Sequence, residues 1–326
     1  MTPIQTFTAT QIDHFRPGVG WSASVFLLKS DGFRQQVRSF PLSDDLEIAL
    51  NAFRGSFHLS SELDPGRIQL QFIESLGTRS SRLQTFRQVS EGATLSFGGN
   101  RGDAVSDQAS RGVAINLGGA AVQQIKAMVS PAVRDRIAAR EGCMPALVTR
   151  MTATGRLLKR RLVRTASLPT IPVDAAEREQ ALLALTAAVI EDALAAPGAS
   201  ETGGSEVVSL PQRLHVAGQV SALLTSCPLT RDGEWTLDEV GQRLRISPRL
   251  IQLAMQEVFG VGFVGYRKLA RLHQLRTSIR QARPGTKVTE IALEHLFSNP
   301  GRMAGQYKEL FGTAPSDDLA QALQHA

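Results

Sequence analysis

Residues 236–260 of the chain read TLDEVGQRLRISPRLIQLAMQEVFG. Thr236 followed three positions later by Glu239 forms a capping box, which starts a helix. Ser247, followed at once by proline, supplies a second N-cap, and Gly260 is a typical helix stop. The segment therefore predicts two short helices joined by a tight turn, the arrangement of a helix-turn-helix.

The second predicted helix of this segment has an apolar side and a polar side. Its apolar residues recur at helical spacing, whereas Arg249, Gln252 and Gln256 project together from the other side. Arginine can bond guanine and glutamine can bond adenine at base edges in the major groove, which admits a helix. We expect these three residues to contact DNA bases.

A second copy of the plan follows in TKVTEIALEHLFSNPGRMAGQYKELFG, residues 286–312. A serine-asparagine pair offers the N-cap, and a proline follows near the first helical position. The outward residues Asn299, Arg302 and Gln306 are candidates for DNA contact, with Lys308 as a phosphate neutraliser. Two glycines inside this helix each cost roughly 1 kcal/mol relative to alanine, so we expect weaker reading by this unit.

Residues 258–289, between the two units, contain lysines and arginines but no acidic residue. Their apolar positions recur at threes and fours, which predicts one long amphipathic helix with a basic outer side. Such a charge run in isolation usually marks a solvated face. Between two reading helices we expect it to lie along phosphates, with Arg271 and Arg276 among the contacts.

The C-terminal third of the chain resembles a known family. Residues 211–324 resemble the DNA-binding domain of AraC/XylS-family transcriptional regulators, and the run HLFSNPGRMAGQYKELFGTAPSDDL is most similar to ethanolamine-operon-regulator-like members. The resemblance implies an all-α domain with two reading helices in successive major-groove segments, and base-reading positions at Arg249 and Gln252. The residues that carry the resemblance are Ser247, Gly260, Tyr266, Arg271, Leu272, Ile291, Ala292, Phe297, Tyr307, Lys308, Phe311, Gly312 and Pro315.

The sequence departs from the family pattern at positions that matter for DNA reading. Leu296 stands where the family usually has glycine, so the turn there must take another geometry or tolerate strain. Leu253 and Gly305 occupy positions that often reach DNA, so no base contact carries over to them.

Length and composition bound the rest of the chain. A length of 326 residues suggests two domains, a 42% hydrophobic content argues against general disorder, and a net charge of +6 fits a polyanionic partner. No apolar run reaches the length of a membrane span and the N-terminus lacks the layout of a secretory signal, so we expect a cytoplasmic protein without membrane contact. Two distant cysteines do not suggest a disulfide framework or a thiolate metal site.

We expect three regions: a sensor and dimerisation domain over residues 1–196, a linker over 197–209, and the DNA-binding domain over 210–326. The linker is rich in Gly, Ser and Pro. The helix predicted from Asp174 has an apolar stripe that either packs on its own domain or pairs with a second copy in a homodimer. The basic run of residues 156–164 is either a solvated face or an accessory DNA contact.

Short segments with alternating apolar residues fill residues 1–120 and favour β-strands. They predict a small antiparallel barrel or sandwich, and the family resemblance implies a cupin-like sensor barrel. The expected fold class is therefore α+β: an N-terminal antiparallel β-barrel sensor followed by an all-α C-terminal domain with two helix-turn-helix motifs.

A sensor implies an effector, for which arginine clusters and glycine-bearing runs are candidates. Guanidinium groups suit phosphate and glycine permits close backbone approach, a pattern loosely similar to cyclic-dinucleotide-binding PilZ barrels. Surface arginines with hairpin glycines, an apolar small molecule, or no ligand at all are the alternatives. The candidate effector residues are Arg34, Arg38, Arg79, Arg82, Arg87 and Asn116.

The sequence does not indicate an enzyme. Its six histidines show no metal-ligand spacing, and no G-x-S-x-G, Walker or dinucleotide motif is present, so we expect no catalytic residue, metal or cofactor. The prediction is an effector-controlled transcription regulator that binds double-stranded promoter DNA; contact with RNA polymerase and homodimerisation stay open. The rival from another class is an architectural DNA-binding protein that needs no ligand.

Overall fold

The computed structural model divides into two compact units. One holds most of residues 1–209, and the other holds residues 210–326 with two short earlier segments, 26–32 and 56–58. An N-terminal sheet domain and a C-terminal helical domain are thus confirmed, whereas the predicted linker lies outside the described residues. The structure describes residues 4–10, 15, 19–29, 32–75, 82–83, 92–99, 101–106, 109–142, 147–195, 212–227, 229–230 and 233–325.

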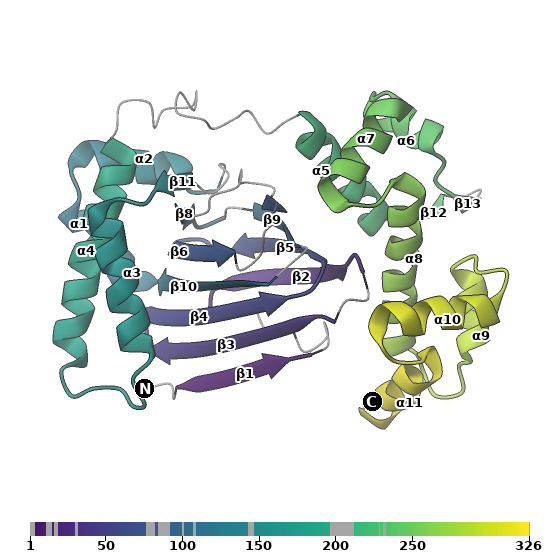
Figure 1. Cartoon of the computed structure of the whole chain (residues 1–326), viewed down its shortest axis with the longest axis horizontal. Coiled ribbons are helices and arrows are strands. Elements are labelled where there is room, and N and C mark those ends of the chain that lie inside the picture. Colours follow the sequence, from purple (N-terminus) through teal and green to yellow (C-terminus); the bar gives the residue numbers. More distant parts are fainter. Residues whose placement is uncertain are drawn as a thin grey trace. The chain divides into compact units, whose positions relative to one another are not determined.

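The strands form two sheets in the N-terminal part of the chain (Figure 1). The larger has the order β1 (Gln5–Ala9), β3 (Arg34–Pro41), β4 (Leu46–Arg54), β10 (Ser110–Leu117), β6 (Ile68–Ser75), β8 (Gly92–Phe97) and β11 (Leu147–Arg150), and all its pairings are antiparallel. The smaller has the order β2 (Trp21–Leu27), β5 (Phe57–Leu63), β9 (Arg101–Ser106) and β7 (Arg82–Leu83).

The described strands do not form the predicted closed barrel. The edge strands β1 and β11 of the larger sheet do not pair with each other, so this sheet is open. One of its faces carries buried apolar residues, among them Ile48, Leu70 and Ile115, which are paired across neighbouring strands. This face packs on helices instead of closing on itself, because the helices supply the apolar partner that the face needs.

Four helices follow β10 and complete the core of the N-terminal unit: α1 (Gly119–Met128), α2 (Pro131–Arg140), α3 (Ala153–Ala166) and α4 (Ala175–Ala195). Leu158 and Leu162 of α3 and Leu183 and Ile190 of α4 join the apolar cluster of the sheet and are fully buried. The apolar stripe of α4 therefore packs on its own unit and is not free to pair with a second copy.

From residue 212 onward, the described elements of the C-terminal unit are helices and one small hairpin. Val240, Ile251, Met255, Tyr266 and Leu275 are fully buried in it. No helix in the described part of the chain combines the length and the apolar character that crossing a bilayer requires. The elements are α5 (Gln212–Ser226), β12 (Leu229–Thr230), β13 (Gly233–Glu234), α6 (Leu237–Leu244), α7 (Pro248–Phe259), α8 (Phe263–Arg280), α9 (Val288–Glu294), α10 (Pro300–Phe311) and α11 (Pro315–His325).

Candidate nucleic-acid interface

Helices α6 and α7 begin and end where local sequence signals place them. The Thr236 hydroxyl accepts a hydrogen bond from the Glu239 N–H at 3.2 Å, and the Glu239 carboxylate accepts one from the Thr236 N–H at 2.7 Å. These bonds complete the predicted capping box and lower the pKa of Glu239. The Ser247 hydroxyl accepts from the Leu250 N–H at 3.3 Å and starts α7.

The turn between α6 and α7 contains a residue with a left-handed backbone. Arg245 has a φ of 57°, and the N–H of Ile246 donates back to the carbonyl of Gly241 at 2.9 Å. The Arg245 N–H donates to the carbonyl of Gln242 at 3.3 Å. This pair of bonds is a Schellman motif, which normally favours glycine at the left-handed position.

Helices α9 and α10 repeat this geometry. Leu296 also has a φ of 57°, and the N–H of Phe297 donates to the carbonyl of Ala292 at 2.9 Å. The Asn299 side chain then accepts a hydrogen bond from the Arg302 N–H at 2.9 Å and starts α10. This helix is 12 residues long, the same length as α7. The chain thus keeps the turn at Leu296 and tolerates the backbone strain that a glycine at this position would avoid.

The three predicted reading residues of α7 are all exposed, but they are not equivalent. The side chain of Arg249 forms no hydrogen bond or ion pair with a described residue. By contrast, Gln252 accepts from the Phe263 N–H at 3.2 Å and so caps α8, which has no side-chain cap of its own at its N-terminus. Gln256 donates to the carbonyl of Gly260 at 3.2 Å. Both glutamines would have to share or release these bonds to contact a base.

On α10, Arg302 and Lys308 are exposed and Gln306 is half-buried. Asn299 is exposed too, although its side-chain oxygen is used as the helix cap. Arg302 is therefore the α10 side chain most available to a base, and it occupies the third residue of its helix as Arg249 occupies the second of α7.

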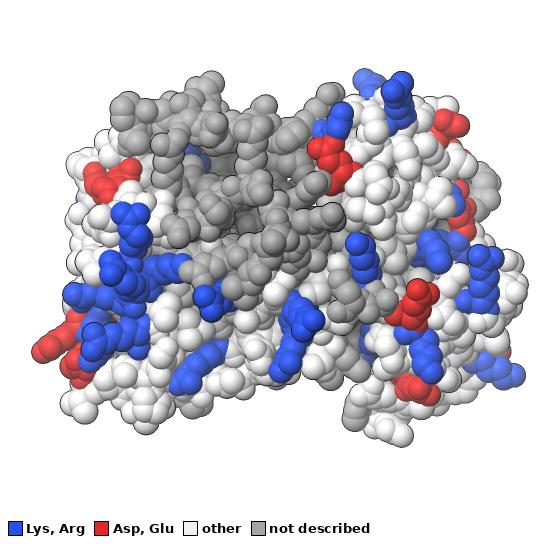
Figure 2. All heavy atoms as spheres, in the orientation of Figure 1, with Lys and Arg blue, Asp and Glu red and all other residues white. Residues whose placement is uncertain are grey.

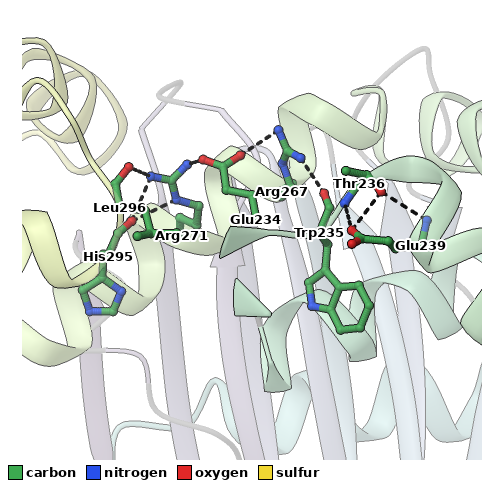
Figure 3. Close-up of polar contacts among 8 residues, drawn as sticks. All are labelled: Glu234, Trp235, Thr236, Glu239, Arg267, Arg271, His295 and Leu296. Carbon is green, nitrogen blue, oxygen red and sulfur yellow. Dashed lines mark hydrogen bonds and ion pairs between the residues drawn. The ribbon is translucent and has the colours of Figure 1, made fainter. Parts of the chain in front are cut away.

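The expectation that Arg271 faces phosphate is wrong, because the residue is buried, with 7% of its surface exposed. It forms an ion pair with Glu234 and donates to the carbonyls of His295 (2.8 and 3.1 Å) and Leu296 (2.7 Å), as Figure 3 shows. Its Cζ also lies 4.2 Å from the ring centroid of Phe297. Every part of this guanidinium is turned to the protein.

Arg276 is likewise not available to phosphate, with 3% of its surface exposed. Its Nε lies 3.2 Å from Oδ2 of Asp318, an ion pair without hydrogen-bond geometry, and its Cζ lies 4.4 Å from the ring centroid of Phe311. The side of α8 that carries Arg271 and Arg276 is therefore internal, and its cations hold the unit together. By contrast, the side chain of Lys268 on the same helix is exposed to solvent.

Glu234 is the central acidic residue of this network, and sequence reasoning missed it. It bridges Arg271 and Arg267, whose Nη2 lies 2.7 Å from the carboxylate, and Arg267 also donates to the carbonyl of Trp235 (Figure 3). Burial lowers the pKa of both arginines, so an adjacent carboxylate offsets part of the cost of their desolvation. No local motif marks Glu234, because its partners lie far along the chain.

Among the candidate effector residues whose side chains the structure describes, Arg38 and Asn116 do not come together. Arg38 and Asn116 lie on opposite faces of the larger sheet, because Arg38 is paired with Leu50, on the Ile48 face, and Asn116 points away from that face. Arg38 donates to the carbonyl of Leu168, whereas Arg34 is exposed. Arg79 and Arg87 lie outside the described residues, and Arg82 is described only as part of the β7 backbone.

Asn116 belongs to a buried chain of polar side chains that crosses four neighbouring strands. It accepts from the Gln69 amide at 2.7 Å and donates to Glu47 at 2.9 Å, and Glu47 accepts in turn from the Ser39 hydroxyl. Asn116 is 3% exposed, and Glu47 and Gln69 are also buried. A carboxylate beside Asn116 disfavours a phosphate there, so this part of the cyclic-dinucleotide pattern does not hold.

The basic run on α3 is exposed. Figure 2 shows lysines and arginines gathered on the side of the N-terminal unit where α3 lies. This exposure is compatible with both a solvated face and an accessory DNA contact. The exposed members are Arg156, Arg160, Arg161 and Arg164.

Comparison with known proteins agrees with the C-terminal architecture. Residues 240–321 match a family described as helix-turn-helix domain. The probable thc operon regulatory protein of Rhodococcus erythropolis is 35% identical over 85 residues, a match that spans 26% of this chain and 26% of that protein. The C-terminal unit is therefore a helix-turn-helix domain of the AraC type.

Solved structures give weaker likenesses. A probable AraC family transcriptional regulator from Rhodopseudomonas palustris is 28% identical, with 33% of this chain and 98% of that chain covered at a TM-score of 0.31. ToxT from Vibrio cholerae is 13% identical (95% and 100% covered, TM-score 0.30), and the AraC-like activator CuxR is 14% identical (78% and 87% covered, TM-score 0.34). TM-scores this low establish no shared overall fold.

Proposed function

We propose that the chain is a transcription regulator whose C-terminal unit reads duplex DNA with two helix-turn-helix motifs. The observation that carries this proposal is the repeated geometry of the helix pairs, each with a left-handed turn residue and an exposed arginine in the first turn of its second helix. Recognition helices contact base edges with residues near their N-termini. Arg249 and Arg302 occupy those positions.

The side chains around these arginines have the chemistry that reading requires. Arg249 and Arg302 each suit the O6 and N7 acceptors of a guanine, and Gln252, Gln256 and Gln306 suit adenine. Lys308 and Asn299 suit phosphate contacts, which position the domain without specifying sequence. With α7 and α10 in successive major-groove segments, each helix reads its own block of bases.

The test is a selection of binding sites from a randomised duplex library with the full chain and its Arg249→Ala and Arg302→Ala variants. We expect two blocks of specified bases, with each variant relaxing one position in one block at a cost of roughly 1 to 3 kcal/mol. Lys268→Ala is the matched control, because this exposed cation lies on α8 and should leave the sequence preference unchanged. Sites without any base preference would instead indicate an architectural DNA-binding protein.

We further propose that the N-terminal unit is a sensor of a small-molecule effector that alters how the two helix pairs sit on a promoter. The buried polar side chains of Asn116 and Glu47 support this proposal, because small-molecule sites use a few placed polar groups to orient their ligand. A ligand for these side chains would be a small hydrogen-bonding molecule. A cyclic dinucleotide is the second candidate and would have to use exposed arginines such as Arg34.

Thermal unfolding of the full chain against a panel of small polar metabolites and cyclic dinucleotides separates these candidates. A ligand at one hundred times its dissociation constant stabilises the folded state by about 2.7 kcal/mol and raises the melting temperature. A shift that Gln69→Ala abolishes and Arg34→Ala preserves assigns the buried polar side chains. The reverse pattern assigns the arginines, and no shift with any compound removes the sensor proposal. A second copy of the chain and RNA polymerase are further partners that this proposal allows.

A further inference from the structure

We infer that the Glu234–Arg271 network fixes the distance between the two reading helices and thereby sets the spacing of the bases that the protein recognises. This inference rests on the proposed function, because spacing has meaning only if both helix pairs read DNA. It assigns a positioning role to two residues that do not themselves touch DNA.

The network connects the entrance of one helix pair to the turn of the other. Glu234 ends β13 and lies two residues before Thr236, the N-cap of α6. Arg271, in the middle of α8, pairs with Glu234 and donates to the carbonyls of His295 and Leu296, which follow the end of α9 (Figure 3). One guanidinium thus contacts both the strand that leads into α6 and the turn between α9 and α10.

The chemistry of this link favours a single geometry. A guanidinium is a rigid planar fork with five donors, so its bonds to a carboxylate and to two carbonyls fix the direction of each partner. Stacking over Phe297 at 4.2 Å fixes the remaining rotation of the plane. An apolar contact of the same size would permit sliding, whereas a buried charged network can specify register even where it adds little stability.

The network also acts on the strained turn. Leu296 is a non-glycine residue in the left-handed region, and Arg271 donates to its carbonyl at 2.7 Å. This bond holds the turn that aims α10. The orientation of α10 relative to α6 and α7 therefore depends on Arg271 at two adjacent carbonyls.

The experiment is a site selection from a randomised duplex library with the full chain and its Glu234→Gln and Arg271→Lys variants. Lys keeps a charge opposite Glu234 but lacks the fork, and Gln keeps the shape of Glu234 without its charge. Lys268→Gln on the same helix is the control. Circular dichroism melting establishes that each variant is folded at the selection temperature.

For the wild-type chain and the control we expect two base blocks at one spacing, preferred at least about tenfold over sites longer or shorter by one base pair. For the variants this preference should fall by roughly tenfold, the loss of a constraint worth about 1.4 kcal/mol, while the bases within each block stay the same. A variant that is folded and keeps the wild-type spacing preference overturns the inference alone. A wild-type selection without two blocks overturns the proposed function as well.

Discussion

The ion pair between Arg276 and Asp318 provides a quantitative test of the internal role of α8. Both residues are buried, with 3% and 2% of their surfaces exposed. Asp318 also accepts from the Tyr307 hydroxyl at 2.6 Å and from the Thr313 hydroxyl at 3.1 Å, so the pair joins α8 to α10 and α11. Removal of one partner leaves the other charge buried.

Breaking a buried ion pair by removing one partner costs about 3 to 5 kcal/mol. Two hydroxyl donors remain on Asp318 in an Arg276→Met variant, so we expect a loss near the lower limit, about 3 kcal/mol. The double variant Arg276→Met with Asp318→Asn removes both charges and keeps an acceptor for Tyr307. Its stability should return to within about 1 kcal/mol of the wild type.

Urea unfolding followed by circular dichroism measures these differences, and DNA binding at several salt concentrations measures the electrostatic role. With the variant folded, Arg276→Met should leave the salt slope of DNA binding unchanged, whereas Lys308→Met, which removes an exposed cation, should reduce the slope by about one. A loss of stability below about 1 kcal/mol together with a reduced salt slope would refute the internal role, because it would place Arg276 on phosphate.

Arg245→Gly should stabilise the protein by about 0.5 to 1 kcal/mol in urea unfolding, because relief of roughly 1 to 2 kcal/mol of left-handed strain exceeds the free-energy cost of the added entropy of the unfolded chain. A destabilised variant would show instead that the arginine side chain supports the turn. Burial lowers the pKa of His295 from its ordinary value of 6.5, so below that pH the unfolded chain binds a proton that the folded chain does not. The free energy of unfolding should therefore fall as the pH falls through 6.5, and the stability of His295→Asn should rise relative to that of the wild type over the same range. A stability difference that does not change with pH would contradict this. Leu253, 43% exposed in the middle of the reading side of α7, should contact a thymine methyl group. Replacement of that thymine by deoxyuridine should weaken DNA binding by the wild type about fourfold and leave binding by Leu253→Ala unchanged. A site in which every thymine can be replaced without loss of affinity would rule this out.

Local signals predicted the C-terminal helices well. The capping box at Thr236, the caps at Ser247 and Asn299 and the stop at Gly260 act within one helical turn, so a single sequence contains all the information that they need. The exposure of Arg249 and Arg302 followed from helical periodicity for the same reason.

Long-range pairing could not be predicted in this way. Arg271 and Arg276 lie on a helix without acidic residues, and their partners Glu234 and Asp318 come from elements before and after it. Helical periodicity gives the direction of a side chain but not the partner that it meets, so the sequence alone does not show that these two cations are internal. Period-two alternation would have separated Arg38 from Asn116 only once the strand register was known.

The proposed function requires α7 and α10 to enter neighbouring segments of the major groove. Methylation interference at guanine N7, on a duplex selected with the wild-type chain, tests this placement because N7 lies in the major groove. We predict two clusters of interfering guanines about one helical turn, roughly 10 base pairs, apart, the first lost with Arg249→Ala and the second with Arg302→Ala. A single cluster, or two clusters that both disappear with the same variant, would contradict the claim.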